Sequence, residues 1–143
     1  MAKCTMQMPE EFLLKVSRLA ERTDEIMPKV LQAGGDVVLA RAKSNLLAVV
    51  GSRTKYKSRS TGELASSLGV SPAKLDRNGN YNVKIGFAEP RRGSGSNAKL
   101  ANIIEYGKHG QPAKPFLKPA KSQSKAEATA AMIRTLESEV DGV

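Results

Sequence analysis

The sequence predicts an α+β fold: long N-terminal helices, an antiparallel β-hairpin sheet, a short helix and a C-terminal helix. Apolar residues recur at helical spacing near both ends of the chain, and they alternate strictly from Tyr81 to Phe87. The dipeptide Asn78-Gly79, which favours tight turns between strands, stands just before the alternating stretch. At 143 residues the chain is expected to form a single domain, 1–143.

Two helices are expected in the N-terminal third, at about residues 9–22 and 27–49. Pro9 suits a first helical turn, where its missing N–H donor is harmless. The first helix has one apolar stripe, formed by Phe12, Val16, Leu19 and Ala20. The second contains Gly34-Gly35, each of which costs about 1 kcal/mol relative to Ala. The pair either permits close packing against a neighbour or marks a kink, and the sequence leaves both open.

Residues 51–62 are expected to form a flexible basic loop, because they are poor in apolar residues and rich in Ser, Thr, Lys and Arg. Within it Arg53, Lys55, Lys57 and Arg59 alternate, so in an extended segment they would project from one side. Such a row would suit a phosphate backbone. A mobile loop whose charges only prevent self-association is an equally good interpretation.

The second strand of the hairpin is expected to bury Tyr81, Val83, Ile85 and Phe87 on one face. A short helix should follow at about residues 97–106, ending at Gly107. The final helix, at about residues 118–140, is expected to present one apolar stripe. The stripe comprises Ala126, Ala130, Ile133, Leu136 and Val140.

Between these last two helices the chain must cross in an extended form, because prolines remove backbone donors and fix φ. The prolines are Pro112, Pro115 and Pro119. Phe116 lies inside this frame, so its ring is expected to anchor the crossing in the core. We expect the Glu105 carboxylate to accept backbone N–H bonds there and the Tyr106 ring to pack against the crossing.

The same stretch resembles a signature of a tailed-bacteriophage family of small neck proteins, described as head–tail joining or tail-completion proteins. The matching residues are Glu105-Tyr106-Gly107, Gln111-Pro112-Ala113, Pro115-Phe116-Leu117 and Pro119-Ala120, with Thr61-Gly62-Glu63-Leu64 and Ser67-Leu68 upstream. The resemblance runs from about residue 33 to 140. The family often has a proline shortly before the Thr-Gly element, where this chain has the basic residues 53–59.

The resemblance implies a non-enzymatic virion protein of the neck or tail, assembled in the host cytoplasm. It implies an oligomeric ring that joins the head connector to the tail, with other neck and tail proteins as partners. The candidate interaction residues are Arg53, Lys55, Lys57, Arg59, Glu105, Tyr106 and Phe116.

The net charge of +9 is concentrated in the middle of the chain, where residues 51–125 contain fifteen basic and four acidic side chains. Such a field favours polyanions or an acidic protein surface. It is compatible with non-specific contact with DNA in a neck channel. It also supports an alternative, a small basic nucleic-acid-binding module, although no groove-reading motif is visible.

The residue inventory argues against catalysis, cofactors and membrane partners. Cys4 is the only cysteine, so neither an intramolecular disulfide nor a cysteine metal site can form. His109 is the only histidine and has no neighbouring carboxylate in the sequence to orient it as a base. No apolar run approaches the roughly 20 residues that span a bilayer. We therefore expect neither enzyme activity nor a cofactor.

Overall fold

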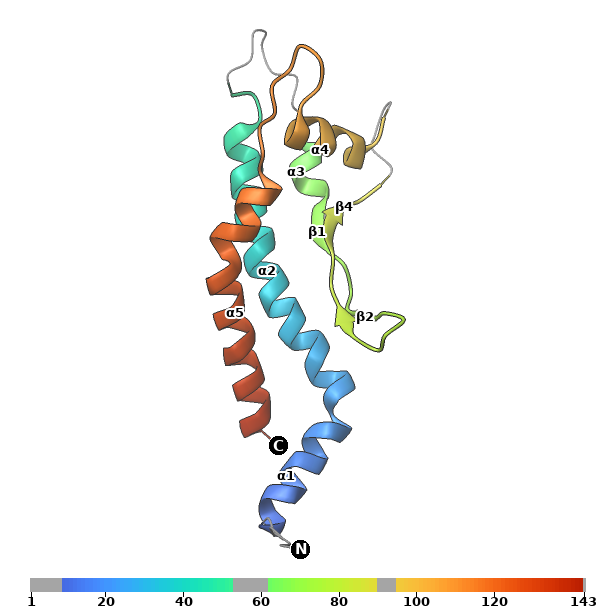
Figure 1. The fold of residues 1–143 in the computed structure, drawn as a ribbon, viewed down its shortest axis with the longest axis vertical. Helices are drawn as coiled ribbons and strands as arrows, with labels where there is room; N and C mark the ends of the chain where they lie inside the picture. Colours follow the sequence, from blue (N-terminus) through green and yellow to red (C-terminus); the bar gives the residue numbers. More distant parts are fainter. Residues whose placement is uncertain (1–8, 53–61, 90–94, 143) are drawn as a thin grey trace, which may run out of the picture.

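The computed structural model describes residues 9–52, 62–89 and 95–142. Its framework is the long helix α2 (Thr23–Val49), which lies alongside the C-terminal helix α5 (Leu117–Asp141) in the opposite direction. Helix α1 (Glu10–Glu21) continues from the start of α2 and extends beyond the end of α5 (Figure 1). Two short helices, α3 (Glu63–Ser67) and α4 (Asn97–Tyr106), lie near the other end of the molecule. The predicted α+β class is confirmed.

Two small antiparallel sheets replace the single hairpin sheet expected from the sequence. Strand β1 (Leu68–Val70) pairs with β4 (Ile85–Phe87), and β2 (Lys74–Leu75) pairs with β3 (Tyr81–Asn82). Val70 faces Ile85 and Lys74 faces Asn82, so three residues, 71–73, lie opposite two, 83–84. This extra residue is a bulge at Pro72, a residue that cannot donate to the ladder.

Because of the bulge, the alternation of buried and exposed residues predicted from Tyr81 to Phe87 holds over only part of that stretch. Val83, Ile85 and Phe87 are partly buried while Lys84 and Gly86 are exposed, as the alternation predicts. Asn82 is as partly buried as Tyr81, so the alternation does not extend into β3. The hairpin turn lies at Asn78-Gly79 as expected. Its geometry depends on Asp76, whose Oδ1 accepts the N–H groups of Asn78 and Asn80 at 2.8 and 2.9 Å.

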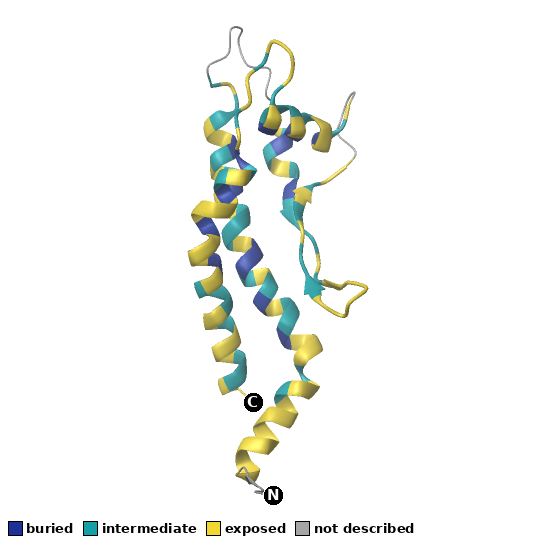
Figure 2. Cartoon of the chain, in the orientation of Figure 1, coloured by how far each residue is buried: buried dark blue, intermediate teal, exposed yellow. Residues whose placement is uncertain are grey.

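The core lies where α2 and α5 meet the short helices. One buried cluster comprises Leu46, Leu64, Ala101 and Phe116, and the other comprises Ala42, Leu68 and Ala120. Figure 2 shows buried residues along the α2–α5 contact and at α3 and α4, whereas α1 is largely exposed. Both clusters therefore lie toward the end that carries the proline-framed crossing, while Ile26 and Val30 are buried near the other end of α2.

The glycine pair of α2 serves close packing on two sides. A Cβ on Gly34 would lie 2.7 Å from Cγ and Sδ of Met132 in α5. A Cβ on Gly35 would lie 3.0 Å from Cγ1 of Val70 in β1. Of the two possibilities that the sequence left open, the structure shows close packing against neighbours at both glycines.

Small residues of α5 form its contact with α2, and the apolar stripe predicted for this helix is wrong. The buried residues are Ala120, Ser124 and Ala128, whereas Ile133 and Leu136 are exposed. Close approach of two helices selects small side chains, and Ile133 and Leu136 face outward, whereas Met132 packs against Gly34. The Ser124 hydroxyl remains satisfied in the interface because it donates to the Ala120 carbonyl at 2.5 Å.

Candidate functional site

The crossing between α4 and α5 is held against α4 by backbone hydrogen bonds. The Gly107 N–H donates to the Ile103 carbonyl at 2.8 Å and ends α4. Lys108 and Gln111 then exchange two bonds, N–H to carbonyl, at 3.0 and 2.9 Å. The Lys114 N–H returns to the Ile104 carbonyl at 2.7 Å. The extended form predicted for the crossing is therefore interrupted by a tight turn at 108–111.

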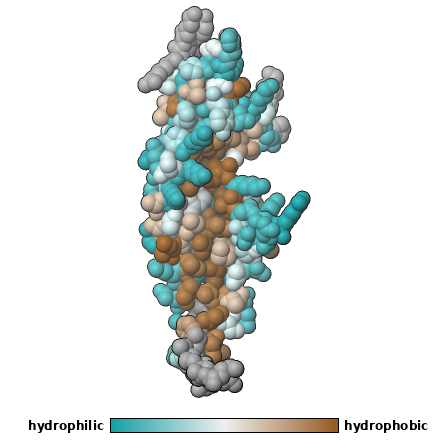
Figure 3. All heavy atoms as spheres, viewed as in Figure 1, coloured by the Kyte–Doolittle hydropathy of each residue, from teal (hydrophilic) through white to brown (hydrophobic). Residues whose placement is uncertain are grey.

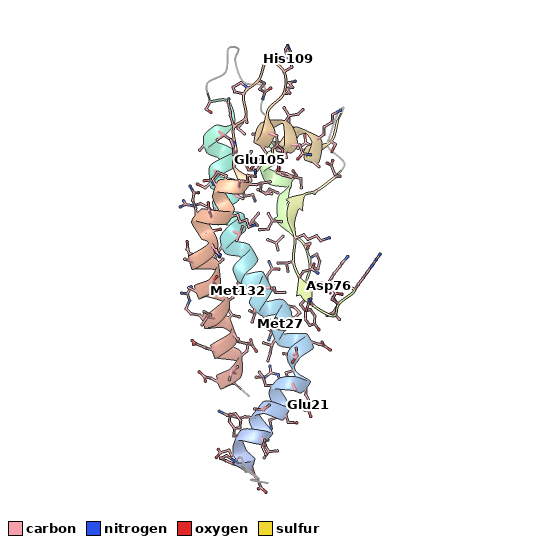
Figure 4. The ribbon with its side chains drawn as sticks, viewed as in Figure 1. Glu21, Met27, Asp76, Glu105, His109 and Met132 are labelled. Carbon is pink, nitrogen blue, oxygen red and sulfur yellow. The ribbon has the colours of Figure 1, made fainter. Side chains whose placement is uncertain are left out.

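Glu105, at the end of α4, caps the beginning of α5 (Figure 4). Its Oε2 accepts the N–H groups of Phe116 and Leu117 at 2.8 and 2.9 Å, and its Oε1 accepts the N–H of Lys118 at 3.0 Å. The residue is buried. The bonding predicted for this carboxylate is confirmed.

These three bonds complete the hydrogen bonding of the first turn of α5. The leading N–H groups of a helix have no partner within the helix. In α5 the third helical residue is Pro119, which has no N–H, and the Ala120 N–H reaches the Phe116 carbonyl at 3.3 Å. One carboxylate thus satisfies every donor that the turn leaves free, and its charge suits the positive end of the helix dipole.

Opposing effects act on the pKa of Glu105. Burial is the largest single effect and raises the pKa, because it disfavours the charged form. The three backbone N–H bonds and the positive charge of Lys118 together outweigh it, so the pKa lies below its ordinary value of 4.5. The carboxylate is therefore held in the charged form that the cap requires.

Replacing Glu105 with Gln is expected to lower the free energy of unfolding by about 2 kcal/mol at neutral pH, because charge-assisted hydrogen bonds are lost. Since the folded pKa is lowered, the contribution of Glu105 is complete above the ordinary value of 4.5 and disappears as the pH falls through the folded pKa. Urea unfolding of both proteins at neutral and acidic pH measures this. The difference in free energy of unfolding between the wild type and Glu105→Gln should become smaller at acidic pH. A difference that does not depend on pH would contradict the charged cap.

The Phe116 ring is fully buried, with 0% of its surface exposed. It packs edge-to-face on Phe87 of β4, with ring centroids 6.2 Å apart and planes at 74°. The Phe116 carbonyl accepts a bond of 3.2 Å from Nδ2 of Asn45 in α2. The burial expected from the proline frame is therefore confirmed, and one residue joins α2, β4 and α5.

Tyr106 differs from the expectation, because its ring is not packed against the crossing. The residue is 65% exposed, and Nζ of Lys118 lies 5.7 Å from the ring centroid. Adjacent residues of an end-of-helix turn point in different directions, so the inward Glu105 leaves Tyr106 outward. The result is an exposed aromatic ring beside a cation, a pairing that suits a contact surface.

The basic residues Arg53, Lys55, Lys57 and Arg59 lie outside the described residues. The chain leading to them is tied to the crossing, since Nζ of Lys114 donates to the Ser52 carbonyl. His109, at the tip of the crossing, is exposed (Figure 4). Among the described residues no group of three or more His, Cys, Asp and Glu side chains could hold a metal ion.

A second polar anchor was not found by sequence reasoning. Asn97 is buried, and its Nδ2 donates to the Ala88 carbonyl at 2.7 Å. Glu89 accepts from the Ser96 hydroxyl at 2.6 Å and from the Ala98 N–H at 2.8 Å. These bonds fix the start of α4 to the end of β4. Ser96-Asn97 is a helix-start signal, but the partner at Glu89 has no such pattern.

The chain matches the protein-family model described as "Bacteriophage HK97-gp10, putative tail-component" over residues 10–107. The match includes the Thr61–Leu68 element and ends at Glu105-Tyr106-Gly107, so it begins earlier and stops earlier than the resemblance described above. No curated protein and no solved structure gives a significant match. Across the described residues no helix is long and apolar enough to cross a membrane.

Proposed function

This chain belongs to the HK97-gp10-like family of bacteriophage tail components, and from that membership we propose that it is a neck subunit forming a ring between the head connector and the tail. As a tail component it is a structural protein of the virion, not an enzyme. The contacts that such a protein makes are with other tail proteins. The ring, the neck position and the head–tail joining role are the proposal.

The main support for the proposal is the apolar surface that the folded chain exposes to solvent. Phe12, Leu13 and Val16 of α1 and Ile133 and Leu136 of α5 are all exposed. In Figure 3 apolar side chains form a band that runs down one face of the molecule toward its N-terminal end. Contiguous exposed apolar surface on a small protein marks a contact with other proteins, which an assembled ring would supply.

We further propose that the basic segment 53–59 contacts DNA that passes through the ring. Phosphate attraction carries no sequence information and lets DNA slide, which suits passage through a channel. Residues 97–125, which the structure describes, are also basic: they contain six lysines and one acidic residue, the buried Glu105. Alternatively, this segment contacts an acidic neighbouring subunit instead of DNA.

Replacing Arg53, Lys55, Lys57 and Arg59 with Gln in the phage tests this role. We expect heads and tails to join normally while DNA retention or ejection is impaired, as measured on purified particles by imaging and by DNA release. A matched variant removes the same charge elsewhere, at the exposed residues Lys74, Arg77, Lys84 and Lys99. Particles that retain and eject DNA normally would refute the DNA role, and heads that fail to join tails would make the segment an assembly contact.

A small nucleic-acid-binding module remains the second candidate, supported by the charge of residues 51–125. The two candidates differ in the mass of the purified chain with and without free duplex. The neck proposal predicts an oligomer in the absence of nucleic acid, or a monomer that forms a ring on a partner surface. Salt-dependent binding of a monomer to duplex, with no oligomer at any concentration, would favour the module.

A further inference from the structure

Helix α1 is an amphipathic helix whose apolar face is not covered by its own chain. None of its residues is buried, and Phe12 and Leu14 are 52% and 57% exposed. At 100° per residue, Phe12, Leu13 and Val16 share one face, together with Leu19 and Ala20. We call these five residues the α1 face. Leu14 lies on the opposite side of the helix. Most helical stability comes from packing an apolar face, so the α1 face calls for a partner.

The charges of α1 do not suit a membrane surface. The helix contains Glu10, Glu11 and Glu21 against Lys15 and Arg18. Helices that lie on anionic lipid carry an excess of Lys and Arg on their polar face. The partner of the α1 face is therefore expected to be a protein with basic residues around an apolar contact.

The two ends of this chain are oppositely charged. The end that carries α1, formed by residues 10–29 and 134–142, has eight acidic and five basic residues. Two of those basic residues, Arg22 and Lys29, form ion pairs with Glu25 and Glu139. The opposite end is basic, as residues 97–125 show. A second copy of the chain therefore offers α1 the complementary charge, provided that unlike ends meet.

The basic end also carries an exposed apolar strip of suitable shape. On the last turns of α2, Ala40, Ser44, Leu47 and Ala48 are all exposed and share one side of the helix. Leu47 is 63% exposed, and the small residues beside it leave room for a second helix to approach. The residues from 40 to 48 include Arg41 and Lys43 and no acidic residue. We call these four residues the α2 strip.

We propose that the α1 face of one subunit docks on the α2 strip of a second copy of this chain. The contact joins two different surfaces, so it is heterologous and closes into a ring when the rotation between subunits allows. It deepens the ring assignment proposed above and rests on it. Apolar contact supplies the attraction, and the unlike charges set which ends meet.

Sedimentation velocity of the full-length chain over a concentration series tests the docking. We expect the wild type to self-associate and the double variant Phe12→Ser/Val16→Ser to associate about 100-fold more weakly, because two apolar contacts are lost. Leu47→Ser should weaken association from the other side. Leu14→Ser is the matched control: it removes an equally exposed leucine from the opposite side of α1 and should leave association unchanged. Far-UV circular dichroism confirms that all four proteins keep their helices.

The possible results separate this proposal from the ring itself. Association that persists in both the α1 and the α2 variants would overturn the docking and leave the ring in place with another interface. Equal weakening by Leu14→Ser would show non-specific apolar contact and would also overturn it. A wild type that stays monomeric at every concentration would overturn the docking and would leave only a ring that forms on a partner surface.

Discussion

Replacing Phe116 with Ala is expected to lower the free energy of unfolding by about 3–5 kcal/mol. The ring has no exposed surface, packs edge-to-face on Phe87 and belongs to the cluster with Leu46, Leu64 and Ala101. Its removal leaves a cavity where α2, β4 and α5 meet. A denaturant titration measures the loss, which is a large fraction of the roughly 5–15 kcal/mol by which small domains are stable.

The chain provides its own control for this substitution. Phe12→Ala removes the same atoms from an exposed position on α1 and should change the free energy of unfolding of the monomer by less than about 0.5 kcal/mol. A loss below about 1 kcal/mol for Phe116→Ala would contradict the core assignment. The ring would then be better interpreted as part of an interface between subunits.

Replacing Gly107 with Ala is expected to destabilise the protein by about 3–5 kcal/mol, through backbone strain and a steric clash together. Gly107 has φ +79° and ψ 177°, a conformation that is essentially restricted to glycine. A Cβ there would also lie 2.7 Å from the Ala113 nitrogen and 2.8 Å from the Gln111 oxygen. These are backbone atoms of the crossing, so they cannot move aside without breaking its hydrogen bonds.

Gly110→Ala separates the two causes. Gly110 has a similar φ of +77°, but a Cβ there would meet nothing within 4 Å. Only the strain of the left-handed conformation remains, so we expect a loss of about 1–2 kcal/mol in the same denaturant titration. Equal losses at the two glycines would mean that the crossing does not lie against the end of α4 as described.

The parts of the site that the sequence predicted are those determined by local chemistry. Three prolines imply an extended crossing, and an apolar residue within a rigid frame implies an anchor. The Glu105 carboxylate was expected to accept backbone N–H bonds in that crossing. Glu105 and Phe116 followed from this reasoning. The outward position of Tyr106 did not, because it depends on the direction in which α4 ends relative to α5.

The parts that the sequence did not predict depend on contacts between distant elements. The α5 stripe was wrong because hydrophobicity alone cannot reveal that this helix buries Ala120, Ser124 and Ala128 and leaves Ile133 and Leu136 exposed. The split of the predicted strand depends on a bulge at Pro72, which lies on the opposite strand. The role of Asn97 was not predicted because its partner, the Ala88 carbonyl, is a backbone group. A pattern of side chains in the sequence cannot indicate such a partner.

The cap on α5 has a consequence for the order in which the chain can acquire structure. The acceptor, Glu105, is synthesised before its three N–H donors. When α4 emerges from the ribosome, the first turn of α5 is therefore not yet present for the Glu105 carboxylate to cap. Conversely, the N-cap residue of α5 does not cap its first turn, since the Phe116 side chain cannot accept a hydrogen bond. The starting point of the C-terminal helix is thus specified by the element before it, and α4 and α5 are expected to become ordered in one concerted step late in synthesis.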